Sequence, residues 1–172
     1  MSKSITYTVE VTPECTKWTV DGKLHRVNGP AVEYQNGTKY WAFNGKLHRI
    51  DGPAAESSNG YKAWYLNGKR HREDGPAVER EDGSKFWYIN DELHRENGPA
   101  VEYENGTKYW FFNGNLHRIG GAAIECANGY KEWYLDGVAM SEEEHHQRTQ
   151  PAIELTVADI EKMLGKKIKI VK

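Results

Sequence analysis

Apolar and aromatic positions recur along this chain with a fixed period of 23 residues. The tryptophans stand at Trp18, Trp41, Trp64, Trp87, Trp110 and Trp133, and five histidines follow the same step at His25, His48, His71, His94 and His117. Self-similarity at a short fixed period is typical of arrays in which each unit buries its apolar face against its neighbours. The sequence therefore predicts a repeat array of six 23-residue units over residues 16–139.

Turn residues inside one unit predict antiparallel strands. Asn36 and Gly37 precede the segment 38–43, and Asn44 and Gly45 follow it. The Asn-Gly pair is the leading signal for a two-residue hairpin turn, because both residues accept positive φ. We therefore expect each unit to be a β-meander of two longer strands and one short strand. The predicted fold class is all-β, an elongated antiparallel repeat sheet.

The pleat of a strand divides the segment 38–43 between two faces. Trp41 and Phe43 share one face, and the Phe43 position is apolar in every unit, so we expect this face to be buried. The Ala42 position lies on the opposite face and is aromatic in later units. This row, which we expect to be exposed and to bind a protein partner, consists of Tyr65, Tyr88, Phe111 and Tyr134. Interface cores are enriched in such side chains.

The segments outside the array are predicted to cap its two ends. Residues 1–15 alternate apolar and polar side chains and predict an N-terminal capping strand. Residues 140–172 predict a small α/β cap, with Ser141 and Thr156 as N-caps of two short helices and a last strand that contains Ile168 and Ile170. The alternative for this tail is a partner-docking helix over residues 157–164, because its apolar side chains lie on one side.

The tandem units Trp-x-x-Asn-Gly-Lys-Leu-His-Arg-x-Asp-Gly-Pro-Ala-x-Glu resemble MORN-type repeats, and more closely the variant repeats of many bacteriophage-encoded proteins. The resemblance covers residues 16–139 and implies a twisted β-sheet rod that binds or scaffolds rather than catalyses. It leads us to expect a phage-encoded inhibitor or counter-defence factor that acts on a host protein. The Gly-x-Gly of the family is replaced here by Arg-x-Asp-Gly-Pro, so partner contacts of MORN proteins are not carried over to these residues.

Composition and charge narrow the classes of function. The 172 residues include 23 Lys and Arg against 25 Asp and Glu, which gives a formal charge of −2 and no basic field for long nucleic acid. No apolar run is long enough to span a membrane, and no apolar signal region precedes the array, so we expect a cytoplasmic protein. Cys15 and Cys126 form no C-x-x-C pair, and no unique nucleophile stands beside a base. We therefore expect neither enzymatic activity nor a cofactor nor a metal site.

A His-Arg pair, followed by Glu seven residues after the Arg, recurs in five units. The pairs are His25 and Arg26, His48 and Arg49, His71 and Arg72, His94 and Arg95, and His117 and Arg118. We favour a structural interpretation, in which Arg pairs with Glu and His bonds a turn backbone, because a role repeated in every unit belongs to the scaffold. The alternative is a ligand groove in which Arg binds phosphate and rings stack on bases, so that the protein sequesters a small nucleotide.

The sequence also has a second, longer period. Residues 99–110 nearly copy residues 30–41, which predicts a duplicated block of three units with two similar surfaces. Departures from the repeat, such as Arg70 and Asp91, are expected to mark surfaces that the scaffold does not dictate. A third alternative for function is a homo-oligomeric rod whose sheet edges pair with copies of the same chain.

Overall fold

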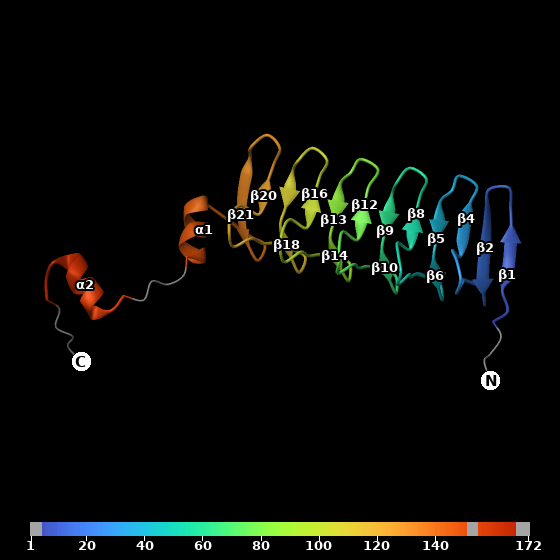
Figure 1. Cartoon of the computed structure of the whole chain (residues 1–172), viewed down its shortest axis with the longest axis horizontal. Helices are drawn as coiled ribbons and strands as arrows, with labels where there is room; N and C mark the ends of the chain where they lie inside the picture. Colours follow the sequence, from blue (N-terminus) through green and yellow to red (C-terminus); the bar gives the residue numbers. More distant parts are fainter. Residues whose placement is uncertain (1–4, 151–154, 168–172) are drawn as a thin grey trace.

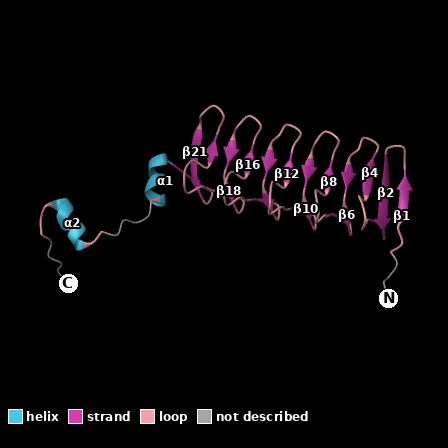
Figure 2. Ribbon diagram, viewed as in Figure 1, coloured by secondary structure: helices cyan, strands magenta, loops and turns pink. Residues whose placement is uncertain are grey.

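The computed structural model describes residues 5–150 and 155–167, and it consists mostly of strands in one long antiparallel sheet (Figure 1). Two short helices follow near the C-terminus, so the predicted all-β class with a small C-terminal cap is confirmed. Consecutive strand pairs lie side by side along the length of the molecule (Figure 2). The strands of this sheet follow one another in chain order, and the chain leaves the sheet at intervals to form short hairpins.

The long sheet is built from one or two strands of every unit. Its strands in spatial order are β1 (Thr8–Val11), β2 (Cys15–Val20), β4 (Val32–Tyr34), β5 (Lys39–Tyr40), β8 (Ala55–Glu56), β9 (Lys62–Ala63), β12 (Val78–Glu79), β13 (Lys85–Phe86), β16 (Val101–Glu102), β17 (Lys108–Tyr109), β20 (Ile124–Glu125), β21 (Lys131–Leu135) and β22 (Val138–Met140), and β3 (Lys23–Leu24) pairs with β2. Short hairpins form a second row below it: β6 (Ala42–Phe43) with β7 (Lys46–Leu47), β10 (Tyr65–Leu66) with β11 (Lys69–Arg70), β14 (Tyr88–Ile89) with β15 (Glu92–Leu93), and β18 (Phe111–Phe112) with β19 (Asn115–Leu116).

The strand of each unit breaks at its tryptophan. Trp41 N–H donates to Ala54 O, next to the following strand of the long sheet (2.8 Å), whereas Trp41 O accepts from His48 N–H, beyond the hairpin (3.0 Å). The backbone therefore changes partners at this residue, leaving the long sheet and entering the hairpin β6–β7. This division explains why the predicted longer strands appear as pairs of short ones.

The two Asn-Gly turns of a unit differ in the structure. Asn44 (φ 50°) and Gly45 (φ 80°) form the predicted two-residue turn of the hairpin β6–β7. At the other turn, Tyr34 N–H donates to Thr38 O, which leaves a three-residue loop. The Asn36 side chain accepts a hydrogen bond from Thr38 N–H (3.0 Å), and Gly37 alone adopts positive φ (84°). The prediction of a two-residue turn at this position is therefore wrong.

The larger core residues lie on the face opposite to the one predicted to be buried, although fully buried alanines such as Ala54 lie on the tryptophan face. The central core consists of Ala55, Ala63, Val78, Phe86 and Val101, which share the face of the tyrosine row. On the other face, three of the six side chains that follow a tryptophan by two residues are exposed: Phe43 (45%), Leu66 (36%) and Phe112 (40%). No second layer covers this face in the described residues, and five of the six tryptophans are covered instead by arginines of their own units.

Helix α1 (Glu142–Thr149) closes the C-terminal end of the array. Ser141 is its N-cap, as predicted, and its hydroxyl accepts from Glu144 N–H (3.1 Å). His145 is 2% exposed, and its Nε2 donates to Arg118 O (2.6 Å), so this histidine fixes the helix to the last complete repeat loop. Sequence reasoning had assigned His145 no such role.

Helix α2 (Val157–Leu164) begins after the predicted N-cap Thr156, which forms a capping box with Asp159, and it ends at Gly165 in the left-handed conformation (φ 64°). None of its residues is buried. The predicted last strand with Ile168 and Ile170 lies outside the described residues. In the part of the chain that the structure describes, no helix is both long and apolar enough to cross a bilayer.

We expect His145→Ala to destabilise the C-terminal end of the array by about 1–3 kcal/mol, because it removes a buried hydrogen bond and leaves Arg118 O without its donor. Urea unfolding followed by tryptophan fluorescence measures the effect. His146→Ala is the matched control, since His146 is exposed on the same helix. Equal stability of the two variants would show that α1 does not cap the array.

Candidate binding grooves

Each repeat loop is held by one arginine. In the third unit, the Arg72 guanidinium lies over the Trp64 ring with Cζ 4.0 Å from its centroid. Its Nη1 donates to Pro76 O (3.2 Å) and to a Glu79 carboxylate oxygen (3.4 Å), and its Nε donates to Asp74 (2.8 Å). Stacking and charge-assisted hydrogen bonds thus act on the same side chain.

The same arrangement recurs in the other four units with a loop. Guanidinium carbons lie 3.7 to 4.1 Å from the ring centroids of Trp18, Trp41, Trp87 and Trp110, and Nη1 atoms of Arg26, Arg49, Arg95 and Arg118 lie 2.7 to 3.2 Å from Glu33, Glu56, Glu102 and Glu125. The predicted pairing of each Arg with the Glu seven residues later is therefore confirmed.

A glycine completes the arginine site on the side away from the indole. A Cβ atom added to Gly75 would lie 2.9 Å from Arg72 Cζ, which is closer than real Cβ atoms approach other atoms. The guanidinium is thus sandwiched between the Trp64 ring and the Gly75 backbone. This contact gives the Asp-Gly-Pro segment of the repeat a packing role in addition to its turn role.

The histidines join each unit to the next one. Asn67 N–H, in the positive-φ turn of the following hairpin, donates to His48 Nδ1 (3.1 Å). The equivalent bonds run from Asn44 to His25, from Asn90 to His71, from Asn113 to His94 and from Asp136 to His117, at 3.2 to 3.3 Å. The predicted bond from His to a turn backbone is confirmed, and it lies between units rather than within one.

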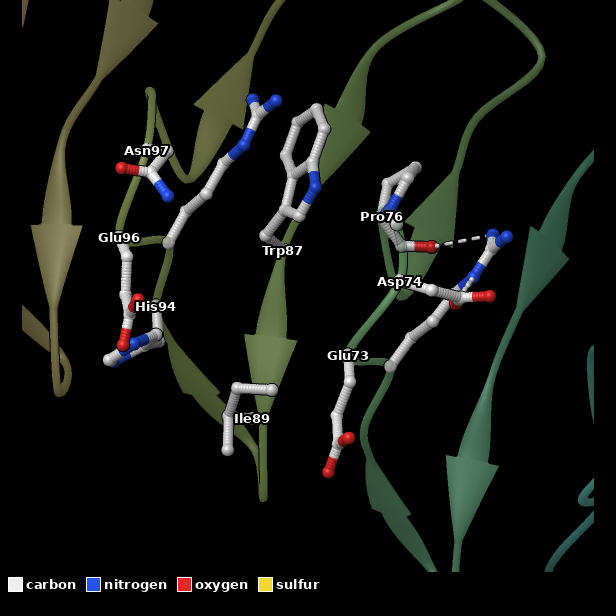
Figure 3. Close-up of a pocket in the computed structure, with 11 residues that line it drawn as sticks. Glu73, Asp74, Pro76, Trp87, Ile89, His94, Glu96 and Asn97 are labelled. Atoms are coloured by element: carbon white, nitrogen blue, oxygen red, sulfur yellow. Dashed lines mark hydrogen bonds and ion pairs between the residues drawn. The ribbon is translucent and has the colours of Figure 1, made fainter.

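The loops of neighbouring units enclose open grooves. Figure 3 shows the central groove, of about 740 Å³. One wall carries Glu73 and Asp74, and the facing wall carries His94 and Glu96, with Trp87 at the floor between them.

Equivalent grooves lie between the other pairs of loops, with volumes of about 560, 800 and 820 Å³. Each inner loop forms a wall of two grooves, because the same residues line both; Arg49, Ile50 and Asp51 are an example. We call these four grooves, bounded by the loops 26–29, 49–53, 72–76, 95–99 and 118–120, the groove row.

The chemistry of the groove row changes along the array at the residue that follows each loop arginine. These residues are Val27, Ile50, Glu73, Glu96 and Ile119. Ile50 is 86% and Ile119 is 63% exposed. Hydrogen bonds from Arg49 and Arg72 lower the pKa of Asp51 and Asp74, so both loop carboxylates stay charged. The row is thus acidic at its centre and has exposed apolar side chains towards both ends.

The aromatic row predicted to bind a partner lies on the other face, against the core. Tyr65, Tyr88 and Phe111 are half-buried and pack on the core cluster, and the Arg70 guanidinium lies 3.9 Å from the Tyr88 ring centroid. Burial raises the pKa of Tyr65. The hydroxyl of Tyr134, at the end of the row, donates to Glu132 (2.7 Å).

Sequence reasoning missed the exposed loop residues of the groove row. The pattern that could have identified them is variation: the position after the loop arginine is isoleucine or valine in some units and glutamate in others, while the His-Arg pair before it stays constant. A position that the scaffold does not fix is available for contacts with other molecules.

No protein-family model matches the chain, and a search of curated proteins finds no match. Within residues 5–150 and 155–167, no group of three or more His, Cys, Asp or Glu side chains is placed to hold a metal ion.

We expect Gly75→Ala to destabilise the array by about 1–3 kcal/mol, because the added methyl group displaces the Arg72 guanidinium from its hydrogen bonds and from the indole. Thermal unfolding measures the loss. Gly120→Ala is the control, since a Cβ there meets nothing within 4 Å. If both variants unfold at the same temperature, the close packing of glycine on arginine does not contribute to stability.

Proposed function

We propose that this chain is a non-catalytic binding protein whose groove row receives a segment of another protein. The observation that carries the proposal is the row of exposed apolar side chains on a face without a covering layer. Phe43, Ile50, Phe112 and Ile119 are all large, apolar and exposed. Contiguous exposed apolar surface with a polar rim is typical of protein interaction sites.

The geometry gives less support to sequestration of a nucleotide. The Arg72 fork already donates from Nε to Asp74 and from Nη1 to Pro76 O and Glu79, so two of its three nitrogens are engaged within the scaffold. The central groove also presents the carboxylates of Glu73 and Glu96, which repel phosphate. A protein segment needs no such phosphate-binding group.

The source of the partner is a separate part of the proposal. The resemblance to phage-encoded repeats supports a host protein as the partner. The same resemblance supports the proposal that binding inhibits this protein or counters a host defence in the bacterial cytoplasm. The homo-oligomeric alternative has one feature in its favour: β1 is the first strand of the sheet, and all four of its residues are exposed.

We expect the double variant Ile50→Glu, Ile119→Glu to weaken partner binding at least about tenfold, because it places charges at both apolar ends of the groove row. Affinity capture from bacterial lysate, quantified by mass spectrometry, measures the retained partner. Val138→Glu is the control, an exposed apolar residue outside the row. Loss of the partner with Tyr88→Ala, Phe111→Ala, but not with the groove variant, would move the binding surface to the aromatic row.

A further inference from the structure

A tyrosine of the chain itself covers the first loop at the N-terminal end of the groove row. The Tyr7 hydroxyl accepts a hydrogen bond from Val27 N–H (3.3 Å), and the Tyr7 ring centroid lies 6.3 Å from that of His25. His25 is only 5% exposed, whereas the four later histidines are half-buried. Tyr7 therefore lies against the histidine side of the first loop. In the next four loops, the equivalent side faces an open groove.

Val27 is the residue that follows a loop arginine, so its backbone N–H has an equivalent in each open groove. These equivalents are the N–H groups of Ile50, Glu73, Glu96 and Ile119. Among the described residues, none of the four donates a hydrogen bond, whereas Val27 donates to Tyr7. Each open groove thus has a backbone N–H equivalent to that of Val27, but no tyrosine hydroxyl accepts from it.

We propose that each open groove binds a tyrosine side chain of the partner, whose phenol oxygen accepts from the backbone N–H that follows the loop arginine. This inference rests on the proposed function and names the chemistry of its partner. The ring meets a suitable surface in the outer grooves, where Phe43 and His48 centroids are 6.3 Å apart and Phe112 and His117 centroids are 5.9 Å apart. Aromatic rings favour tilted contacts at such separations.

The spacing of the grooves specifies the backbone of the partner. Each unit adds two strands to the sheet, or about 9.6 Å at the usual distance between strands. A polyproline II helix advances about 9.3 Å in three residues and returns to the same side. A segment with tyrosine at every third position therefore places successive rings in successive grooves. Basic residues between the tyrosines complement Glu73, Asp74 and Glu96 at the centre.

The test uses the full chain and a synthetic peptide with four Tyr-Pro-Lys repeats, followed by amide chemical shifts. We expect the amides of Ile50, Glu73, Glu96 and Ile119 to shift, and the amide of Val27 to stay in place because Tyr7 occupies its donor. A matched peptide with four Phe-Pro-Lys repeats lacks the phenol oxygen and is expected to bind at least about fivefold more weakly. Peptides with tyrosine at every fourth position are expected to bind more weakly, because their tyrosines cannot occupy successive grooves at the same time.

The variant Tyr7→Ala extends the test to the first loop. Removal of the ring exposes the Val27 donor, so the Val27 amide is expected to join the responding set. Tyr7→Phe keeps the ring in place and is expected to leave Val27 unresponsive, and unchanged amide positions elsewhere verify that both variants are folded.

Three results would overturn the inference: no shift of the four amides, equal binding of the Phe peptide, or equal binding of the peptide with the wrong spacing. A chain that captures its partner through Ile50 and Ile119, yet ignores the tyrosine peptides, would retain the proposed function without this partner chemistry. A chain that binds the peptides but captures no protein would retain the groove chemistry and contradict the proposed function.

Discussion

The array depends on a guanidinium held between an indole and a glycine. A single-layer sheet has no second layer of helices or strands to cover its tryptophan face. A loop arginine supplies that cover in five of the six units, as Arg72 does for Trp64, and Arg72 is fixed by Pro76 O and Glu79. One side chain thereby shields an indole, closes a loop and ties that loop to the next strand. On the other face, a small cluster of Ala55, Ala63, Val78, Phe86 and Val101 forms the core, and half-buried tyrosines pack against it.

Commitment of the arginines to the scaffold determines where other molecules can bind. Each loop arginine lies on its tryptophan and donates to a carbonyl of its own loop, whereas the residue after it, such as Ile50 or Glu73, is exposed. The scaffold residues repeat in every unit, whereas this position changes from apolar to acidic along the array. A repeated scaffold with variable outer residues allows one architecture to present different surfaces.

The sequence predicted the parts of the fold that depend on local chemistry. The period, the Asn44 turn, the helix caps and the pairing of Arg with Glu follow from residues close together in the chain. The buried face was predicted wrongly because the pleat argument assumes a straight strand, whereas the backbone changes hydrogen-bond partners at Trp41. Arg70 and Asp91 were interpreted as surface departures, yet Arg70 Nε donates to Asp91 (2.7 Å). Such a pair requires knowledge of how neighbouring units stack, which a single sequence does not contain.

No groove belongs to a single unit, and this has a consequence for binding. Each groove lies between two loops, and the relation of those loops is fixed by bonds to the following hairpin, such as Asn67 N–H to His48 and Arg49 N–H to Tyr65 O. Fraying of one unit therefore opens the grooves on both of its sides. A partner that occupies several grooves holds those unit boundaries closed, so its binding energy also stabilises the array. Four shallow grooves of modest individual affinity can in this way act as one site, provided that the partner has their spacing.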